Sequence, residues 1–244
     1  MPKTRSIFKL LFSLLFSFYL IPMSDTPILA IETSVENGSV AVLKGEKVIL
    51  ERSFFAGRKP SATLWAPLKE VMEEISSLSA IVVGIGPGSY NGSRVGIAAA
   101  QGIALNFSCP VIPLCSFEGV TSNSSRTLAI GDARRGHFSL QQLSEGRLLG
   151  SFSLVDNEKL AEALRASAEN NEEVFSFDEP NRFPVAADLQ QLIHRKTSSA
   201  RTLAAAYLKR SESEREKLSQ TVAEPFYLRD PHITVGKRKS LLER

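Results

Sequence analysis

Histidine and cysteine are scarce in this sequence of 244 residues, and their scarcity excludes several kinds of site. The three histidines, His137, His194 and His232, stand alone, so no H-x-x-x-H pair can hold a metal ion on one helical turn. Cys109 and Cys115 match neither a C-x-x-C motif nor a disulfide framework. We expect both cysteines to be reduced and partly buried.

A charge excess of one sign is also missing. The chain has 29 basic and 26 acidic residues, for a net charge of +3. Nucleic-acid-binding domains usually carry a stronger basic footprint, so we expect any contact with RNA to be shared with other subunits. The sequence lacks the G-x-S-x-G elbow of many serine hydrolases, which disfavours conventional hydrolase chemistry.

Long hydrophobic runs are absent apart from Phe8–Pro22, which is short for a membrane span of about 20 residues. With Lys3 and Arg5 before it, this run resembles a signal peptide, although no small-x-small cleavage site follows. The alternative is translation from Met23, which would give a cytoplasmic protein. We favour that alternative and expect no association with a membrane.

The first half of the chain shows a β-rich opening followed by alternating helices and strands. Glu36-Asn37-Gly38 is typical of a turn, Ser61 of a helix N-cap, and Pro67 of a kink. The run Ala80–Ile85 has no polar residue, which predicts a central strand. The other predicted strands are Pro27–Ile31, Ser39–Leu43, Val48–Phe55 and Val111–Leu114. An apolar second helix, from about Ser93 to Phe107, should be buried on more than one side.

The pattern restarts after the polar stretch Thr121–Arg126, which we interpret as a hinge. This repetition predicts two similar α/β lobes. The predicted strands are Thr127–Gly131, His137–Leu143, Arg147–Leu154 and Val174–Phe177. The predicted helices are Glu158–Ala168, Ala186–Arg195 and Ser199–Arg210.

A glycine-rich segment joins the central strand to the second helix. Glycines allow close approach of the backbone, and free N–H groups at a helix start favour anions, so a phosphate site is one hypothesis. The segment matches neither the P-loop nor the dinucleotide fingerprint, and a tight turn that packs the helix on the sheet is favoured. The candidate residues are Gly86, Gly88, Ser89, Asn91, Gly92 and Arg94.

Two helices offer a candidate docking surface. Small residues recur at helical spacing on the second helix, and an apolar stripe runs along the first. Contact within the lobe and contact with another subunit explain this pattern equally well. The candidate interface comprises Leu64, Trp65, Leu68, Val71, Met72, Ile75, Gly92, Gly96, Ala99 and Ala100.

Two strand ends carry polar side chains. Glu32, Thr33 and Ser34 end the first strand, where α/β folds place ligands. Asp132 and Arg134 end a strand of the second lobe. A solvated strand end and an ion-paired turn are the simpler interpretations of these two groups.

In combination these segments resemble the TsaB family. The resemblance rests on Ile28-Leu-Ala-Ile-Glu-Thr-Ser34 with Ser39-Val-Ala-Val42, on Gly86-Pro-Gly-Ser-Tyr-Asn-Gly-Ser-Arg-Val-Gly96, and on two later markers, Asp132-Ala-Arg134 and Pro225-Phe-Tyr-Leu-Arg229. These segments follow one another in the order typical of the family, from Ile28 to Arg229. The sequence departs from the family pattern at Ser61, where histidine is common, and at Asn91, where threonine is usual.

The resemblance implies a two-lobed actin-like fold of the ASKHA, RNase H-like type, with mixed sheets and flanking helices. It also implies a non-catalytic subunit that binds the homologous catalytic subunit TsaD, works with the ATPase TsaE, and supports threonylcarbamoyl modification of adenosine 37 in tRNA. ATP and a metal ion would act at the level of the complex, with no cofactor for this chain alone. Contact with tRNA would be indirect at most, and a homodimer would use the same helices.

Four segments follow from this interpretation: a leader (1–23), a first lobe with the docking helices (24–120), a divergent second lobe (121–197), and a terminal helix that returns to the first lobe before a basic tail (198–244). Two other functions stay open. The glycine-rich segment suits a free-standing ATP-dependent enzyme of the same superfold, and a glycoprotease-like hydrolase is a weaker alternative.

Overall fold

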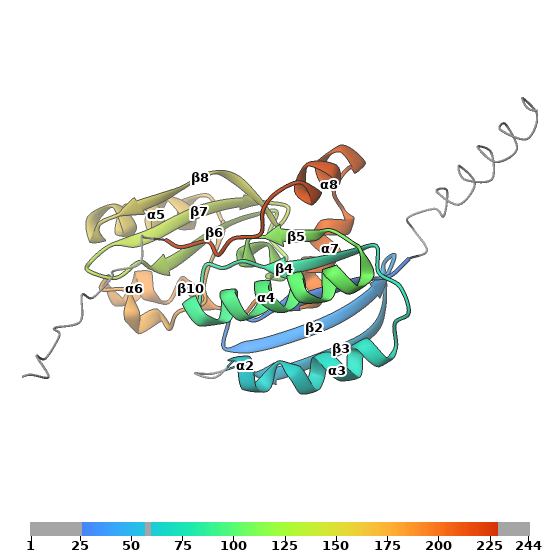
Figure 1. Ribbon diagram of the computed structural model, residues 1–244. Helices are drawn as coiled ribbons and strands as arrows, with labels where there is room; N and C mark the ends of the chain where they lie inside the picture. Colours follow the sequence, from blue (N-terminus) through green and yellow to red (C-terminus); the bar gives the residue numbers. More distant parts are fainter. Residues whose placement is uncertain (1–25, 57–59, 229–244) are drawn as a thin grey trace, which may run out of the picture.

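A computed structural model describes residues 26–56 and 60–228, which form two five-stranded sheets lying side by side (Figure 1). The strands of the first sheet are β1 (Ile28–Glu32), β2 (Asn37–Lys44), β3 (Lys47–Phe55), β4 (Ala80–Gly84) and β5 (Val111–Leu114). The strands of the second are β6 (Arg126–Asp132), β7 (Phe138–Ser144), β8 (Arg147–Val155), β9 (Glu173–Ser176) and β10 (Ile193–Arg195). The leader and the basic tail lie outside the described residues.

The helices are short apart from two. They are α2 (Pro60–Thr63), α3 (Trp65–Glu73), α4 (Tyr90–Phe107), α5 (Asn157–Glu169), α6 (Ala187–Gln190), α7 (Ala200–Leu208) and α8 (Glu212–Ser219), with 3-10 turns η1 (Ser116–Gly119) and η2 (Pro180–Arg182). Within the described part of the chain, none of these helices has the length and apolar content of a transmembrane span.

The two sheets repeat one topology. The first has the order β3-β2-β1-β4-β5 and the second the order β8-β7-β6-β9-β10. In each, three strands pair antiparallel, and two further strands add in parallel beside the first of them. This repetition confirms the predicted pair of similar α/β lobes and the mixed sheets of an actin-like fold.

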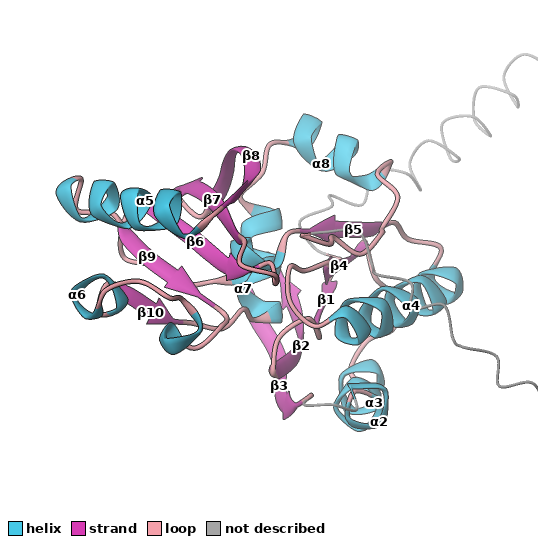
Figure 2. Ribbon diagram, turned by 90° about the vertical axis from the view of Figure 1, so that its left-hand side faces the viewer, coloured by secondary structure: helices cyan, strands magenta, loops and turns pink. Residues whose placement is uncertain are grey.

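The first sheet is covered on both faces, which explains why β4 and the first four residues of β1 are apolar. Leu29 and Ile31 of β1 pack toward α3 and α4, whereas Ile28 and Ala30 pack toward α7 on the other face. Figure 2 shows α3 and α4 on one side of this sheet. Alternate residues of a strand point to opposite faces, so a strand in the middle layer must be apolar at every position.

The second sheet is also covered on both faces, by α5 and α6 on one and by the cluster around η1 on the other. Leu128 and Ile130 of β6 pack with α5 and α6, and Ala129 faces a cluster that contains Phe117 of η1. The aromatic ring of Phe117 contacts Phe175 at a centroid distance of 5.7 Å. The 3-10 turn after β5 therefore helps to cover the back of the second sheet.

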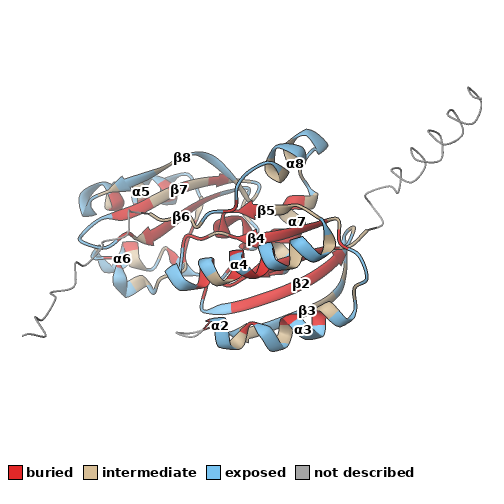
Figure 3. Ribbon diagram, in the orientation of Figure 1, coloured by how far each residue is buried: buried red, intermediate tan, exposed pale blue. Residues whose placement is uncertain are grey.

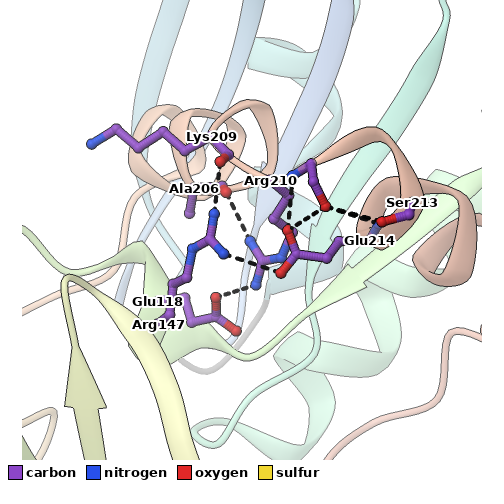
Figure 4. Close-up of polar contacts among 8 residues, drawn as sticks. Glu118, Arg147, Ala206, Lys209, Arg210, Ser213 and Glu214 are labelled. Carbon is purple, nitrogen blue, oxygen red and sulfur yellow. Dashed lines mark hydrogen bonds and ion pairs between the residues drawn. The ribbon is translucent and has the colours of Figure 1, made fainter.

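Four residues connect the last helices with both lobes through ion pairs and hydrogen bonds (Figure 4). Arg210, just after α7, pairs with Glu118 of η1, and both side chains are almost fully buried. Arg147 of β8 reaches Glu214 of α8 at 3.1 Å and the carbonyl of Lys209 at 2.6 Å. This network fixes the α7–α8 corner against the edge of the second sheet.

Several local predictions were wrong. The turn after β1 lies at Ser34–Glu36, and Asn37 and Gly38 already belong to β2. Ser61 lies inside α2 and caps no helix. By contrast, the kink or late start expected at Pro67 is confirmed, because the chain breaks at Leu64 before α3 and Pro67 has no N–H to donate to the carbonyl four residues earlier.

Three helix predictions also need correction. The helix α4 begins at Tyr90 with Ser89 as its N-cap, three residues earlier than predicted. The predicted helix Ala186–Arg195 is the short α6 followed by β10, because Ile193 pairs with Val174 of β9. The helix α8 was missed, since it buries no residue and has no apolar stripe.

Candidate functional site

The polar end of β1 is closed by internal hydrogen bonds. Glu32 has 0% of its surface exposed. Its Oε1 accepts hydrogen bonds from the N–H and the hydroxyl of Ser34, both at 2.7 Å, and its Oε2 accepts one from the hydroxyl of Ser198 at 2.7 Å. Ser34 Oγ also lies 2.7 Å from Ser116 Oγ. The carboxylate is thus satisfied inside the protein and does not face a ligand.

The glycine-rich turn packs directly on this strand end. The N–H of Ser89 donates to the carbonyl of Ser34 at 2.6 Å, and the N–H of Gly86 donates to Ser116 Oγ at 3.0 Å. The N–H of Gly92 donates to Ser89 Oγ at 3.1 Å. These donors are engaged within the chain, so a phosphate bound here would have to displace them.

The small residues at the start of α4 serve close packing in the same place. A Cβ atom on Gly92 would collide with the carbonyl of Thr33, and one on Gly96 would collide with the hydroxyl of Thr33. That hydroxyl in turn donates to the carbonyl of Gly92 at 2.8 Å. The spacing of Gly92 and Gly96 therefore matches the end of β1 in the same lobe.

The remaining residues of the candidate phosphate turn point elsewhere. Asn91 and Arg94 are exposed, and the guanidinium of Arg94 lies over the ring of Tyr90 at 5.2 Å and donates to its hydroxyl at 2.9 Å. Tyr90 stacks on Tyr227 with their ring centroids 4.9 Å apart. Arg94 thus supports an aromatic pair on the surface.

The equivalent hairpin of the second lobe carries an ion-paired turn. Asp132 accepts hydrogen bonds from Arg134 at 3.0 Å and from Arg182 at 2.8 Å. Its own N–H donates to Asp178 at 2.9 Å. Burial raises the pKa of Asp178 above its ordinary value, and the neighbouring charge of Asp132 adds to this effect. Arg135 is exposed beside them, in the left-handed backbone region with φ 56°.

A cleft of about 1510 Å³ lies between the two hairpins. Ser34 and Ser89 line it from the first lobe, and Asp132 and Arg135 line it from the second. The C-terminal segment 225–228 runs along the cleft, where the N–H of Phe226 donates to the carbonyl of Ile85 at 2.8 Å. The cleft brings the two predicted strand ends, Glu32–Ser34 and Asp132–Arg134, to the same region of the molecule.

The predicted docking residues divide into buried and exposed groups. Seven of them have buried side chains or backbone inside the first lobe and present no surface to a partner: Leu64, Leu68, Val71, Gly92, Gly96, Ala99 and Ala100. They pack on β1, β2 and β4, and the docking interface itself stays a prediction. Met72 and Ile75 are half-buried, and Trp65 is 56% exposed.

The outward face of α4 was missed, since the helix was expected to be buried on more than one side. Leu105 is 84% exposed, and Ala98, Gln101 and Gly102 are exposed on the same side of the helix. Figure 3 shows this exposed side of α4. Trp65, at the start of α3, is exposed as well, and α3 follows directly on α2, which contacts α4. We call Trp65, Ala98, Gly102 and Leu105 the helical face.

The scarce residues lie apart from one another. Burial raises the pKa of both thiols, strongly for Cys115. His137 and His194 are exposed, and His232 lies outside the described residues. Among residues 26–56 and 60–228, no three histidine, cysteine or acidic side chains are grouped so that they could hold a metal ion.

Sequence reasoning also missed the residues that complete the Glu32 cluster. Ser116 and Ser198 come from distant parts of the chain, and no local pattern links either of them with β1. By contrast, the capping box of α8, in which Ser211 and Glu214 bond each other reciprocally, was readable from the sequence spacing.

Comparison with known proteins agrees with this geometry. Residues 61–154 match the family described as TsaD, tRNA N6-adenosine threonylcarbamoyltransferase. The chain is 28% identical over 141 residues to the tRNA threonylcarbamoyladenosine biosynthesis protein TsaB of Haemophilus influenzae, which covers 53% of this chain and 59% of that protein. It is 31% identical over 131 residues to the TsaB of Bacillus subtilis, which covers 50% and 57%. The chain thus spans less than two thirds of these curated relatives.

The fold is also shared with a solved structure. YeaZ from Pseudomonas aeruginosa superposes with a TM-score of 0.64 at 23% identity, over 83% of this chain and all of that one. The chain is therefore a two-lobed α/β protein of the actin-like class, with a first lobe that carries the glycine-rich turn. Over about half of its length the chain is also similar to the two TsaB proteins.

Proposed function

We propose that this chain is a non-catalytic subunit for threonylcarbamoyl modification of adenosine 37 in tRNAs that read codons beginning with A. It acts by binding and supporting a TsaD catalytic subunit. Support comes from the two curated TsaB relatives, whose names assign them to biosynthesis of this modified nucleoside. The likeness of residues 61–154 to TsaD further suggests that the two subunits are homologous.

The observation that carries this proposal is the exposure of Leu105 on the helical face. A leucine with 84% of its surface in solvent, on a helix side that also carries small residues, is typical of an interface that is filled in a complex. The small residues Ala98 and Gly102 would let a partner helix approach closely. No atom lies within 4 Å of the place where Gly102 would carry a Cβ.

The interior of the first lobe points the same way. Glu32 accepts hydrogen bonds from Ser34 and Ser198, and the N–H of Gly86 in the glycine-rich turn donates to Ser116. These internal bonds leave little chemistry at the end of β1. The chain would then contribute a surface, while ATP and the metal ion act in TsaD and in the ATPase TsaE. It would need no cofactor of its own, would work in the cytoplasm, and would contact tRNA at most indirectly.

The test is the binding of the TsaD of the same organism to the chain and to the variant Leu105→Glu, measured by calorimetry. A charge placed at the centre of an apolar interface should weaken binding by about 2 kcal/mol or more, or roughly 30-fold. Leu149→Glu is the matched control, because Leu149 is 51% exposed on β8 of the other lobe. Equal affinity of both variants and the parent would refute the helical face as the docking site.

Reconstitution then tests the function itself. Threonylcarbamoyl-adenosine formation should require the chain together with TsaD and TsaE, and Leu105→Glu should reduce it in parallel with binding. Full activity without this chain would contradict the proposal. In the absence of TsaD, a homodimer through the same face is expected, and Leu105→Glu should then shift the chain to a monomer in light scattering.

The alternative is a free-standing ATP-dependent enzyme, and the cleft of about 1510 Å³ with the exposed Arg135 is the observation in its favour. Calorimetric titration of the isolated chain with ATP and magnesium distinguishes the two. Tight binding with turnover supports the enzyme, and no binding supports the scaffold. Proteolysis by the pure chain would instead revive the glycoprotease-like alternative.

A further inference from the structure

A second cavity lies on the far side of the first lobe, away from the cleft and from the helical face. It has a volume of about 500 Å³ and sits between the start of β1, the turn after β2, and the helices α7 and α8. Ile28, Leu43 and Leu208 supply apolar walls. This size and this lining are typical of sites for small ligands, which span roughly 300–1,000 Å³.

Two hydrogen-bond donors that border this cavity have no partner among the described residues. The Nε of Arg215 is buried and makes no hydrogen bond, and Arg215 forms no ion pair within residues 26–56 and 60–228. Tyr207 is only 3% exposed and lines the same cavity, and no described residue hydrogen-bonds its hydroxyl. A buried donor without a partner, such as the Nε of Arg215, is costly and rare, so an acceptor is expected beside it.

The charges around the cavity favour an anion. Lys209 and Arg215 are positive, and Glu46 is the single acidic residue in the lining, which leaves one net positive charge. Burial raises the pKa of Tyr207, so its hydroxyl keeps its proton and can donate a hydrogen bond at neutral pH. The donors thus suit an oxygen anion, and the walls suit an apolar body.

We propose that this cavity binds a small monocarboxylate with an apolar tail. The carboxylate accepts hydrogen bonds from Arg215 and Tyr207, and the tail lies against Ile28, Leu43 and Leu208. A free phosphate fits less well, because it is strongly hydrated and most of the wall is apolar. The site is independent of the proposed docking function, since none of its residues belongs to the helical face.

The test uses octanoate as the probe and octanol as its uncharged counterpart, titrated into the full chain by calorimetry. Octanoate should bind with a defined stoichiometry of one and should bind more tightly than octanol. Tyr207→Phe, which removes only the hydroxyl, should weaken octanoate binding several-fold, and Arg215→Met should weaken it about tenfold or more. Lys217 is exposed on α8, the helix that carries Arg215. Lys217→Met should therefore leave binding unchanged.

Three results would overturn the proposal. The first is no saturable binding of octanoate, and the second is equal binding of octanoate and octanol by the parent and by Arg215→Met. The third concerns the residues before Thr26, which lines the cavity. If octanoate binds only after Leu14→Asp is introduced in the full chain, the apolar leader itself is the occupant. Thermal unfolding of each variant separates a lost site from a lost fold.

Discussion

Glu32 is a buried carboxylate, and its hydrogen-bond donors among residues 26–56 and 60–228 are one backbone N–H and two hydroxyl groups. Each of these hydrogen bonds replaces part of the hydration that the carboxylate loses on burial. Two of these donors belong to Ser34, two residues along the chain, and the third belongs to Ser198, 166 residues away. The proximity of Ser34 to Glu32 follows from their spacing in the sequence, whereas the contact with Ser198 does not.

At the residue scale, two glycines of α4 should respond to alanine in opposite ways. Gly96→Ala should lower the free energy of unfolding by about 1–3 kcal/mol, since the new Cβ collides with Thr33. Gly102→Ala should raise it by up to about 1 kcal/mol, since its Cβ meets open space and alanine favours the helix. Urea unfolding measures both. A change of the same sign in the two variants would contradict this account of α4.

The cysteines give a pH prediction at the same scale. Burial raises the pKa of both thiols, so at about pH 8 they remain protonated and react slowly, because the thiolate is the nucleophile. Iodoacetamide should label Cys115 only after unfolding and Cys109 more slowly than a free thiol. Mass spectrometry of timed samples, with and without guanidinium, checks this. Rapid labelling of Cys115 in the folded chain would show that the thiol is accessible.

At the scale of elements, α4 shows how a composition can mislead. It is mostly apolar between Val95 and Leu105, yet one side faces solvent, with Leu105 in the last turn of the helix. Apolar surface on a helix is usually buried against another surface. The lobe does not cover this side of α4, and the proposed partner would. The opposite case is α8. Its polar sequence gives no helical pattern of apolar residues, yet the helix forms with a capping box and a hydrogen bond from Arg147 to Glu214.

The α7–α8 corner provides the test at this scale. Arg210→Met should destabilise the chain by about 3–5 kcal/mol, since it leaves the buried carboxylate of Glu118 without its partner. Lys69→Met, which breaks the exposed pair with Glu73, should cost less than about 0.5 kcal/mol. Thermal or urea unfolding compares the two. Similar losses in both variants would mean that the buried pair contributes no more than a surface pair.

For the whole molecule, the two lobes repeat one topology and are joined at several points. The segment 225–228 contacts both, because the N–H of Phe226 bonds Ile85 of the first lobe and its ring contacts Phe152 of the second at 4.4 Å. Leu228 reaches the vicinity of Gly131 in β6. This segment ties the lobes along the cleft, as its path in Figure 1 shows.

Phe226→Ala should therefore loosen the arrangement of the lobes more than the lobes themselves. We expect a loss of about 1–3 kcal/mol for a half-buried aromatic side chain, together with faster hydrogen exchange of the amides that border the cleft. Val222→Ala is the control, because Val222 is 71% exposed just before the segment. Unchanged exchange along the cleft in Phe226→Ala would contradict the role of this segment.

Periodic apolar residues were enough to predict the strands and most helices, because they report which faces must be buried. The resemblance to the TsaB family could also be recognised from the chain alone, because the glycine-rich turn and the first strand end are local motifs. The fold was needed to place Leu64, Leu68 and Val71 in the core and Leu105 on the surface. It was also needed to find that Ile193 forms a strand and that Ser198 hydrogen-bonds Glu32. These outcomes depend on contacts between distant segments, which no local pattern of side chains can encode.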